Sequence, residues 1–207
     1  MEWPCAGLLH KTGGERQIVA KLVIGLGNPG RRYRETRHNV GWMVLDEVAR
    51  IYGLDDEQER YEGLLGQAGP LLLFKPLTYM NRSGRAVRAA LDGLDIDPQD
   101  SLTLVDDFSL PLGSLRMRPS GSSGGHRGLE SIVEKLDSDE WPRLRLGIGP
   151  CPPRMPAKDF VLSKFLEDEL PELDRMVEQG AEAVRCWAEK DIQTAMDRYN
   201  ERRDASA

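Results

Sequence analysis

The chain has 207 residues, of which 40% are hydrophobic, and a formal net charge of -6 at pH 7. This length fits one domain with one buried core, and the acidic balance excludes a histone-like protein that coats a polyanion. Three cysteines are scattered without a CxxC pair, so neither a disulfide framework nor a zinc site is expected. The opening residues lack a basic start and no apolar stretch is as long as a membrane span, so we expect a cytoplasmic protein without signal peptide or membrane anchor.

Charge is unevenly spread along the chain. Residues 21–50 carry six positive and three negative side chains, whereas residues 155–207 carry eight positive and thirteen negative ones. This distribution favours a local cationic face on an acidic body. Such a protein would grip a nucleic acid at one place instead of coating it.

The first elements are predicted from the apolar pattern. Residues 1–20 have no clear period and are expected to form an extension of uncertain order, followed by one domain over residues 21–203. The apolar run at residues 22–26 is typical of a central strand. A polar loop over residues 28–39 leads to a helix at residues 40–52, with Asn39 as its N-cap and Gly53 as its stop.

The rest of the chain alternates strands and helices. The expected strands lie at residues 63–69, 71–75, 102–106, 114–118 and 143–148, the first two joined by a tight turn at Gly69-Pro70. One helix is expected around residues 86–94 and another around residues 129–137, and the carboxyl-terminal 40 residues are expected to be helical from Pro171, with a break near Asp191. This order predicts a single α/β domain, a twisted mixed β-sheet with helices on both faces, whose ligands bind at the carboxyl ends of strands.

Gly25-x-Gly27-x-x-Gly30 has the spacing of a dinucleotide-binding loop. In that fold a helix begins at the loop and places its amino terminus against the pyrophosphate. Here Pro29 and a long polar loop delay the helix, and Asp46 falls inside the helix instead of ending a second strand. We therefore expect no nucleotide cofactor, and we expect the glycines to turn the backbone and bring Asn28 into a cleft. A tight turn without a ligand is the alternative.

Five ordered motifs resemble those of the bacterial-type peptidyl-tRNA hydrolases. They are Gly25-Leu-Gly-Asn-Pro-Gly30 with Thr36-Arg-His-Asn39, Lys75-Pro-Leu-Thr-Tyr-Met-Asn-Arg-Ser-Gly84, Val105-Asp-Asp-Phe-Ser-Leu-Pro-Leu-Gly113, Gly124-Gly-His-Arg-Gly-Leu129 and Arg143-Leu-Arg-Leu-Gly-Ile-Gly149. The resemblance covers residues 21 to about 200. Five motifs in order are far more specific than any one of them.

The resemblance implies an enzyme that cleaves the ester between a peptide and the 3′ ribose of tRNA and so recycles the tRNA. It implies that His38 is the general base and that Asp106 orients its imidazole. Asn28 and Asn81 match two cleft asparagines whose amides serve the reacting carbonyl or water. Taken alone, His38 would be a cap or surface residue and Asp106 a strand-end turn residue.

The resemblance also implies substrate contacts. Tyr33 and Met80 match cleft positions that would pack the terminal adenine or the peptide, although each alone would be read as core. Cations would hold the tRNA acceptor stem and 3′ end without reading sequence, or would simply be solvated. These cations are Arg31, Arg32, Arg34, Arg37, Arg116, Arg118, Arg127 and Lys135. For His126 we expect a structural or substrate-loop role.

The sequence departs from the family pattern at two positions. Arg127 stands where the family has an asparagine, and Ser109 replaces a carboxylate of the third motif. We expect Arg127 to bind an anion, with crowding of the cleft as the alternative, and Ser109 to affect loop packing. The resulting hypothesis is a monomeric hydrolase without metal or other cofactor. The alternative is a non-catalytic RNA-binding relative of the same fold.

Overall fold

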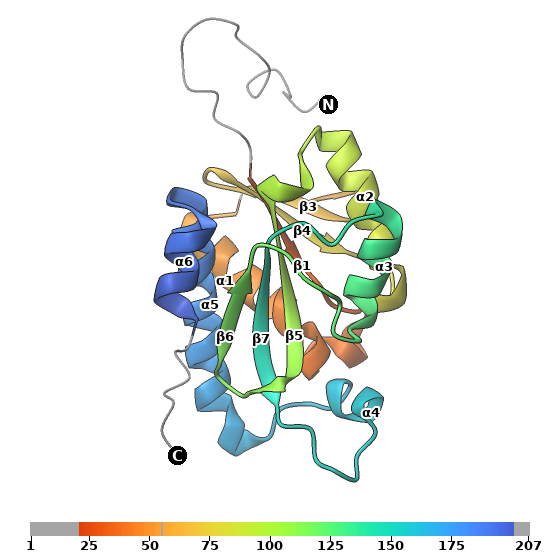
Figure 1. Ribbon diagram of the computed structural model, residues 1–207, viewed down its shortest axis with the longest axis vertical. Coiled ribbons are helices and arrows are strands. Elements are labelled where there is room, and N and C mark those ends of the chain that lie inside the picture. Colours follow the sequence, from red (N-terminus) through yellow and green to blue (C-terminus); the bar gives the residue numbers. More distant parts are fainter. Residues whose placement is uncertain (1–20, 55, 201–207) are drawn as a thin grey trace, which may run out of the picture.

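The computed structural model describes residues 21–54 and 56–200 and contains a seven-stranded sheet in the order β2-β3-β4-β1-β5-β7-β6 (Figure 1). The expected extension at residues 1–20 lies outside the described residues. The strands are β1 (Lys21–Gly25), β2 (Gln58–Arg60), β3 (Gly63–Ala68), β4 (Leu71–Pro76), β5 (Ser101–Pro111), β6 (Leu115–Arg118) and β7 (Arg143–Gly149). The central strand β1 pairs in parallel with β4 and β5, and β5 pairs in parallel with β7. The other pairs are antiparallel, so the expected mixed sheet is confirmed.

Helices cover both faces of this sheet (Figure 1). The α-helices are α1 (Val40–Tyr52), α2 (Ser83–Leu94), α3 (Arg127–Leu136), α4 (Ala157–Val161), α5 (Leu170–Glu189) and α6 (Ile192–Tyr199). Short 3-10 helices precede or follow several of them, namely η2 (Arg31–Tyr33), η3 (Arg37–Asn39), η4 (Met80–Arg82), η5 (Pro98–Asp100) and η6 (Glu167–Glu169). Within the described ranges, no helix is long and apolar enough to cross a membrane.

Alternation along β1 builds two separate cores. Val23 packs with residues of α1, α5 and α6 such as Val44 on one face, and Leu22 and Ile24 pack with residues of α2 and α3 such as Val87 on the other. Successive side chains of a strand point to opposite faces, which explains the division. The short apolar run at residues 22–26 is therefore explained by a strand that is buried on both faces.

Several boundaries differ from the predicted ones. Two elements were missed: β2, an edge strand of three polar residues, and α4, a helix of five residues. Both are too short to show a hydrophobic period. Strand β5 continues past Asp106 to Pro111 through an irregular register with β7. The hairpin turn at Gly69-Pro70 and the break at Asp191, which caps α6 through Thr194 N–H, are confirmed.

Gly25 and Gly27 also allow close packing, a role in addition to the expected one of turning the backbone and bringing Asn28 into a cleft, and Asn28 does line a pocket. A Cβ on Gly25 would lie 2.8 Å from the carbonyl oxygen of Gly41, and one on Gly27 would lie 2.8 Å from the ring of Trp42. Both neighbours belong to α1, so the glycines let this helix approach the end of β1. Only Gly30, with φ of 105°, needs the conformational freedom of glycine.

Candidate active site

A pocket of about 420 Å³ lies where β1 and β4 end and the following loops begin, beside residues 106–108 of β5. This is the expected edge of the sheet for a ligand. Seven of the nine residues predicted for the site line it: Asn28, Tyr33, His38, Met80, Asn81, Asp106 and Arg127. The other two, Arg118 on β6 and Lys135 on α3, are exposed and lie outside its lining.

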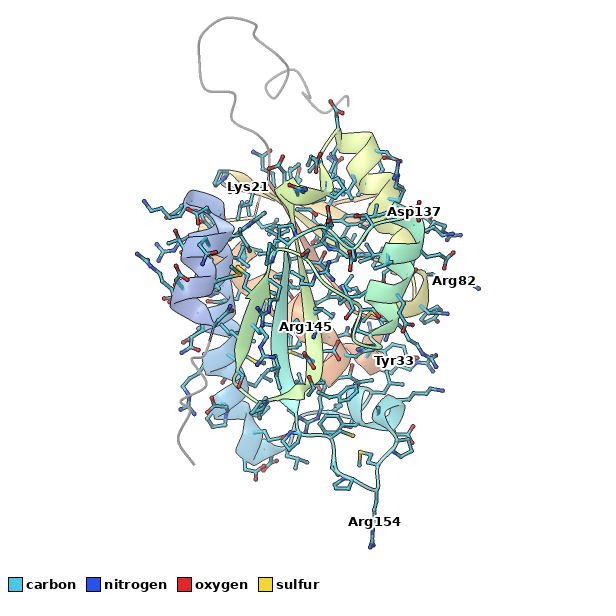
Figure 2. The ribbon with its side chains drawn as sticks, in the orientation of Figure 1. Lys21, Tyr33, Arg82, Asp137, Arg145 and Arg154 are labelled. Carbon is cyan, nitrogen blue, oxygen red and sulfur yellow. The ribbon has the colours of Figure 1, made fainter. Side chains whose placement is uncertain are left out.

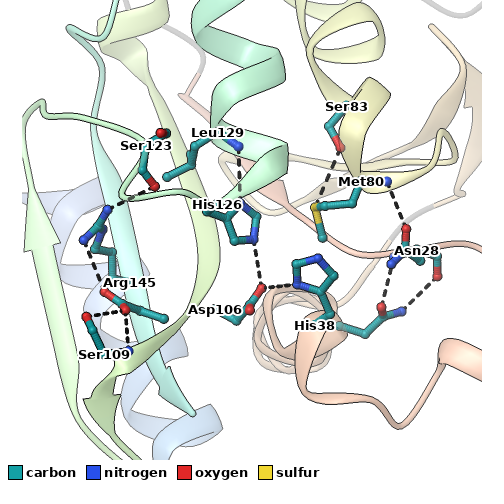
Figure 3. Close-up of polar contacts among 12 residues, drawn as sticks. Asn28, His38, Met80, Ser83, Asp106, Ser109, Ser123, His126, Leu129 and Arg145 are labelled. Atoms are coloured by element: carbon teal, nitrogen blue, oxygen red, sulfur yellow. Dashed lines mark hydrogen bonds and ion pairs between the residues drawn. The ribbon is translucent and has the colours of Figure 1, made fainter. Parts of the chain in front are cut away.

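The centre of the pocket is a buried carboxylate shared by two histidines (Figure 3). Asp106 is 4% exposed, and its Oδ1 lies 2.7 Å from Nδ1 of His38 and 3.0 Å from Nε2 of His126. The predicted pairing of His38 with Asp106 is therefore present. The second histidine was expected to have a structural or loop role, and the structure adds a direct contact with the carboxylate.

Hydrogen bonds assign the tautomers of both imidazoles. Nδ1 of His126 accepts from the backbone N–H of Leu129 at 3.2 Å, so its hydrogen must be on Nε2, which donates to Asp106. His38 then donates from Nδ1 to the same oxygen, and its Nε2 is left with a lone pair. His126 caps α3 through this bond, although no capping role was predicted for it.

Electrostatics keep Asp106 ionised. Burial by itself would raise the pKa of this carboxyl, but attraction and hydrogen bonds from His38 and His126 outweigh burial and hold the pKa well below its ordinary value. A permanent negative charge therefore faces both imidazoles. It favours the positive charge that an imidazole gains when it takes up a proton.

Asn39 positions Asn28 instead of capping α1. Its side chain accepts from Asn28 N–H at 2.9 Å and donates to the Asn28 carbonyl at 3.0 Å, and it makes no capping bond. The expected N-cap is thus corrected: this amide is used to fix the loop after β1. Asn28 in turn accepts from Met80 N–H at 2.9 Å through Oδ1, which orients its Nδ2 hydrogens toward the pocket that Asn28 lines (Figure 3).

The remaining predicted cleft residues differ in burial. Asn81 is exposed and is the second residue of η4, whereas Met80 is 4% exposed and its N–H donates to the Asn28 amide. Tyr33 is half-buried, and the guanidinium of Arg32 lies 4.6 Å from its ring centroid. The pocket therefore combines an apolar wall with amides and two imidazoles.

The predicted cations do not form one group. Arg127 is the first residue of α3, is exposed in the pocket wall, and has no ion-pair partner among the residues the structure describes. Arg37 is the opposite case: it is 3% exposed and paired with Glu169, so the prediction that it faces tRNA is wrong. Arg82 and Arg154, by contrast, lie at the surface in Figure 2.

The pocket wall also contains residues that were not predicted as site residues, among them Arg145 and Lys158. Arg145 donates to Asp107 at 3.2 Å and to the carbonyls of Ser122 and Ser123, and it lies in front of the sheet in Figure 2. The pattern Arg143-x-Arg145 could have indicated these contacts of Arg145. Two arginines at alternate positions of a buried strand need hydrogen-bond acceptors that are also buried. For Lys158 on the short helix α4 no such pattern exists.

Ser109, the second departure from the family pattern, lies in the last part of β5 and contacts Asp107. Its N–H and Oγ–H both donate to Oδ1 of Asp107, at 2.8 and 2.6 Å, while Oδ2 of Asp107 accepts from Arg145. Both carboxylate oxygens of Asp107, at the edge of the pocket, therefore accept hydrogen bonds. The expected effect of Ser109 on loop packing stays a prediction.

His38, Asp106 and His126 are also the group that could hold a metal ion in the described part of the chain, with candidate ligand atoms within 4.8 Å of one another. Each imidazole directs an N–H at Asp106 Oδ1 in the assigned tautomers. A metal would need to displace both hydrogens. The hydrogen-bonded arrangement fits proton transfer better than metal ligation.

The chain matches known proteins along almost its whole length. A family model described as peptidyl-tRNA hydrolase matches residues 22–207. The peptidyl-tRNA hydrolase of Symbiobacterium thermophilum is 46% identical over 188 residues, which are 88% of this chain and 100% of the relative. That of Syntrophomonas wolfei is 43% identical over 184 residues, 87% of this chain and 100% of the relative.

A solved structure gives the same result for the fold. The crystal structure of peptidyl-tRNA hydrolase from Acinetobacter baumannii has a TM-score of 0.82 and 30% identity, and the match covers 91% of this chain and 97% of that one. This chain therefore belongs to the peptidyl-tRNA hydrolase family.

Proposed function

We propose that the protein hydrolyses the ester between a peptide and the 3′ ribose of tRNA, with His38 as general base. The observation that carries this proposal is the His38–Asp106 pair in the pocket, with Nδ1 of His38 donating at 2.7 Å and Nε2 left as a proton acceptor. An ester hydrolase needs a base, a group that orients it, and donors for the developing oxyanion. His38, Asp106 and Asn28 supply these three functions.

The reaction follows from these positions. Nε2 of His38 takes a proton from water while the water oxygen bonds to the ester carbonyl carbon, and Asp106 stabilises the imidazolium that forms. The carbonyl electron pair moves to its oxygen, where the Nδ2 hydrogens of Asn28 and the amide of Asn81 donate. Collapse of this intermediate breaks the bond to the 3′ oxygen, which receives the proton from Nε2.

The remaining residues of the pocket would bind the substrate. Tyr33 and Met80 provide apolar surface for the terminal adenine or the peptide. Arg127 would contact phosphates of the 3′ end, and Arg118 and Lys135 would contact the acceptor stem outside the pocket. We propose that the enzyme works as a monomer without a metal.

Replacing the base tests this function. We expect His38→Ala to slow release of peptide from N-blocked aminoacyl-tRNA by about 10²- to 10⁴-fold, while tRNA affinity stays close to that of the parent. Activity should be the same with and without EDTA. A variant within threefold of the parent rate would remove His38 from this role, and EDTA inhibition reversed by trace divalent ion would show a metal requirement. A parent protein that binds tRNA without turnover would favour the non-catalytic RNA-binding alternative.

A further inference from the structure

Arg37, the residue before His38, occupies an unusual buried site. Its side chain is 4% exposed, and its guanidinium carbon lies 4.6 Å from the ring centroids of both Phe160 and Phe165. Two aromatic faces therefore enclose a permanent cation. A planar guanidinium can stack in this way and still donate at its edge.

Three acceptors from separate segments meet that edge. Nη2 forms a partly buried ion pair with Glu169 of η6, Nη1 donates to the carbonyl of Ile148 on β7 at 3.3 Å, and Nε donates to Oγ of Ser163 at 3.3 Å. A desolvated cation is costly unless it is paired and hydrogen-bonded, so these partners hold the side chain in one conformation. Arg37 thus joins the loop of the base to the end of β7 and to the segment after α4.

The backbone reinforces this connection. The N–H of Arg37 donates to the carbonyl of Ser163 at 2.9 Å, and Thr36 forms an isolated antiparallel bridge with Lys164. The segment held in this way continues from α4, which contacts η3 and lies at one end of the molecule in Figure 1. Lys158 and Val161 of α4 line the pocket of the candidate active site. One wall of the pocket and the base are therefore attached to the same guanidinium.

We propose that Arg37 is a positioning residue that sets His38 against Asp106 and, at the same time, places the α4 wall of the pocket. The inference rests on the proposed role of His38 as base. Arg37 is assigned no contact with the substrate, because its side chain is buried and each of its three nitrogens donates to a partner within the protein. Lysine would keep the charge, but its ammonium cannot fill the planar space between two rings or reach three fixed acceptors.

Arg37→Lys is the test, with Arg50→Lys as the matched control. Arg50 also forms an ion pair with a glutamate, Glu47, but its side chain is 71% exposed and outside the pocket lining. We expect Arg37→Lys to lower kcat by about 10- to 100-fold, because small displacements of a base are costly, and to raise KM through the α4 wall. The acid limb of the kcat profile should move to lower pH, because a looser His38–Asp106 contact favours the imidazolium less. Arg50→Lys should match the parent in all three.

A second variant separates positioning from stability. Glu169→Gln keeps an oxygen for Nη2 and for the N–H of Leu166, which donates to Glu169 at 2.7 Å, but removes the charge. If Arg37 acts by position, this variant should show a smaller change than Arg37→Lys in the same direction, in protein that is folded by circular dichroism and thermal unfolding. If Arg37→Lys and Glu169→Gln are both folded and both keep the pH profile and KM of the parent, the positioning role of Arg37 is wrong. In that case an inactive His38→Ala would still support the proposed function. An active His38→Ala would instead show that His38 is not the base.

Discussion

At the residue scale, the shared carboxylate oxygen changes what a mutation of Asp106 should do. Both imidazole hydrogens meet the same atom, Oδ1. Asparagine could turn its amide oxygen to that position and still accept both hydrogens, so the tautomers would survive the substitution. The charge would not survive, and the imidazolium would lose its stabilising partner.

We therefore expect Asp106→Asn to slow hydrolysis by about 10²- to 10⁴-fold through loss of charge. The acid limb of the pH–rate profile should move to lower pH, because a neutral amide favours the protonated base less than a carboxylate does. Rates from pH 5 to 9 on N-blocked aminoacyl-tRNA would measure both effects. A slow variant with the parent profile would contradict the pairing.

Arg127 is one of the two positions at which this chain departs from the family pattern. Its position in the structure favours an anion as its partner. It begins α3, where backbone N–H groups already attract negative charge, and it lines the pocket. Arginine has five donors and no acceptor, so it cannot orient a water through an acceptor as asparagine can. A phosphate of the tRNA 3′ end is the partner that we propose.

Arg127→Asn should accordingly weaken tRNA binding, reduce the slope of log affinity against log salt by about one unit, and leave kcat nearly unchanged. Arg175→Asn, at an exposed ion pair on α5, is the control and should keep the parent slope. If both variants have the parent slope and Arg127→Asn raises kcat, the arginine crowds the pocket instead of binding phosphate.

At the element scale, the contact between α2 and α3 depends on one glycine. A Cβ on Gly84 would lie 1.9 Å from the carbonyl oxygen of Ser131, and the N–H of Gly84 donates to the Ser131 hydroxyl at 3.1 Å. The helices approach each other through backbone atoms that cannot move aside. This contact matters for the pocket, because η4 before α2 carries Met80 and the first residue of α3 is Arg127.

Gly84→Ala should lower the free energy of unfolding by about 1 to 3 kcal/mol, since the helices must separate to admit a methyl group. Gly180→Ala in α5 is the control, because its nearest neighbours are methyl groups of Val44 at 3.1 Å and alanine improves helix propensity. Urea unfolding of both variants measures the difference. Equal free energies of unfolding for the two variants would show that α2 and α3 can move apart with little loss of stability.

At the scale of the whole molecule, the buried carboxylate links stability to pH. The pKa of Asp106 is lower in the folded protein than its ordinary value, so the unfolded chain binds a proton there at a higher pH than the folded one. The stability that Asp106 contributes is therefore complete above its unfolded value of about 4 and is lost as pH falls below it.

Protonation of Asp106 in the unfolded chain should consequently lower the stability of the parent by roughly 1 kcal/mol between pH 5 and pH 3. This loss requires a carboxylate that stays charged in the folded protein, which carbon-13 NMR of the carboxyl groups across the same pH range measures directly, with Asp106→Asn identifying the signal. An Asp106 carboxyl that takes up its proton near its ordinary pH of about 4 in the folded protein would mean that the two imidazoles do not hold it in the charged form.

The class of fold, most of the strands and α-helices, and seven residues of the pocket could be predicted from the amino-acid sequence alone. Strong local patterns carry that information: the apolar run at residues 22–26 predicted a buried strand, and the helical period after Asn39 predicted α1. Resemblance in five ordered motifs brought His38, Asp106 and Asn28 together before any geometry was known. Each of these signals lies within a short stretch of chain.

The partner that each polar group takes depends on the tertiary structure and could not be predicted from the sequence. Asn39 precedes a helix and would cap it, yet the end of β1 lies close enough for its amide to bind Asn28 instead. Arg37 stands in a cationic loop, yet two phenylalanines and Glu169, over 120 residues away, enclose it. His126 meets Asp106 because the chain before α3 brings the N-cap of this helix to the middle of β5. Such contacts depend on distances between segments remote in sequence, and local propensity contains no information about them.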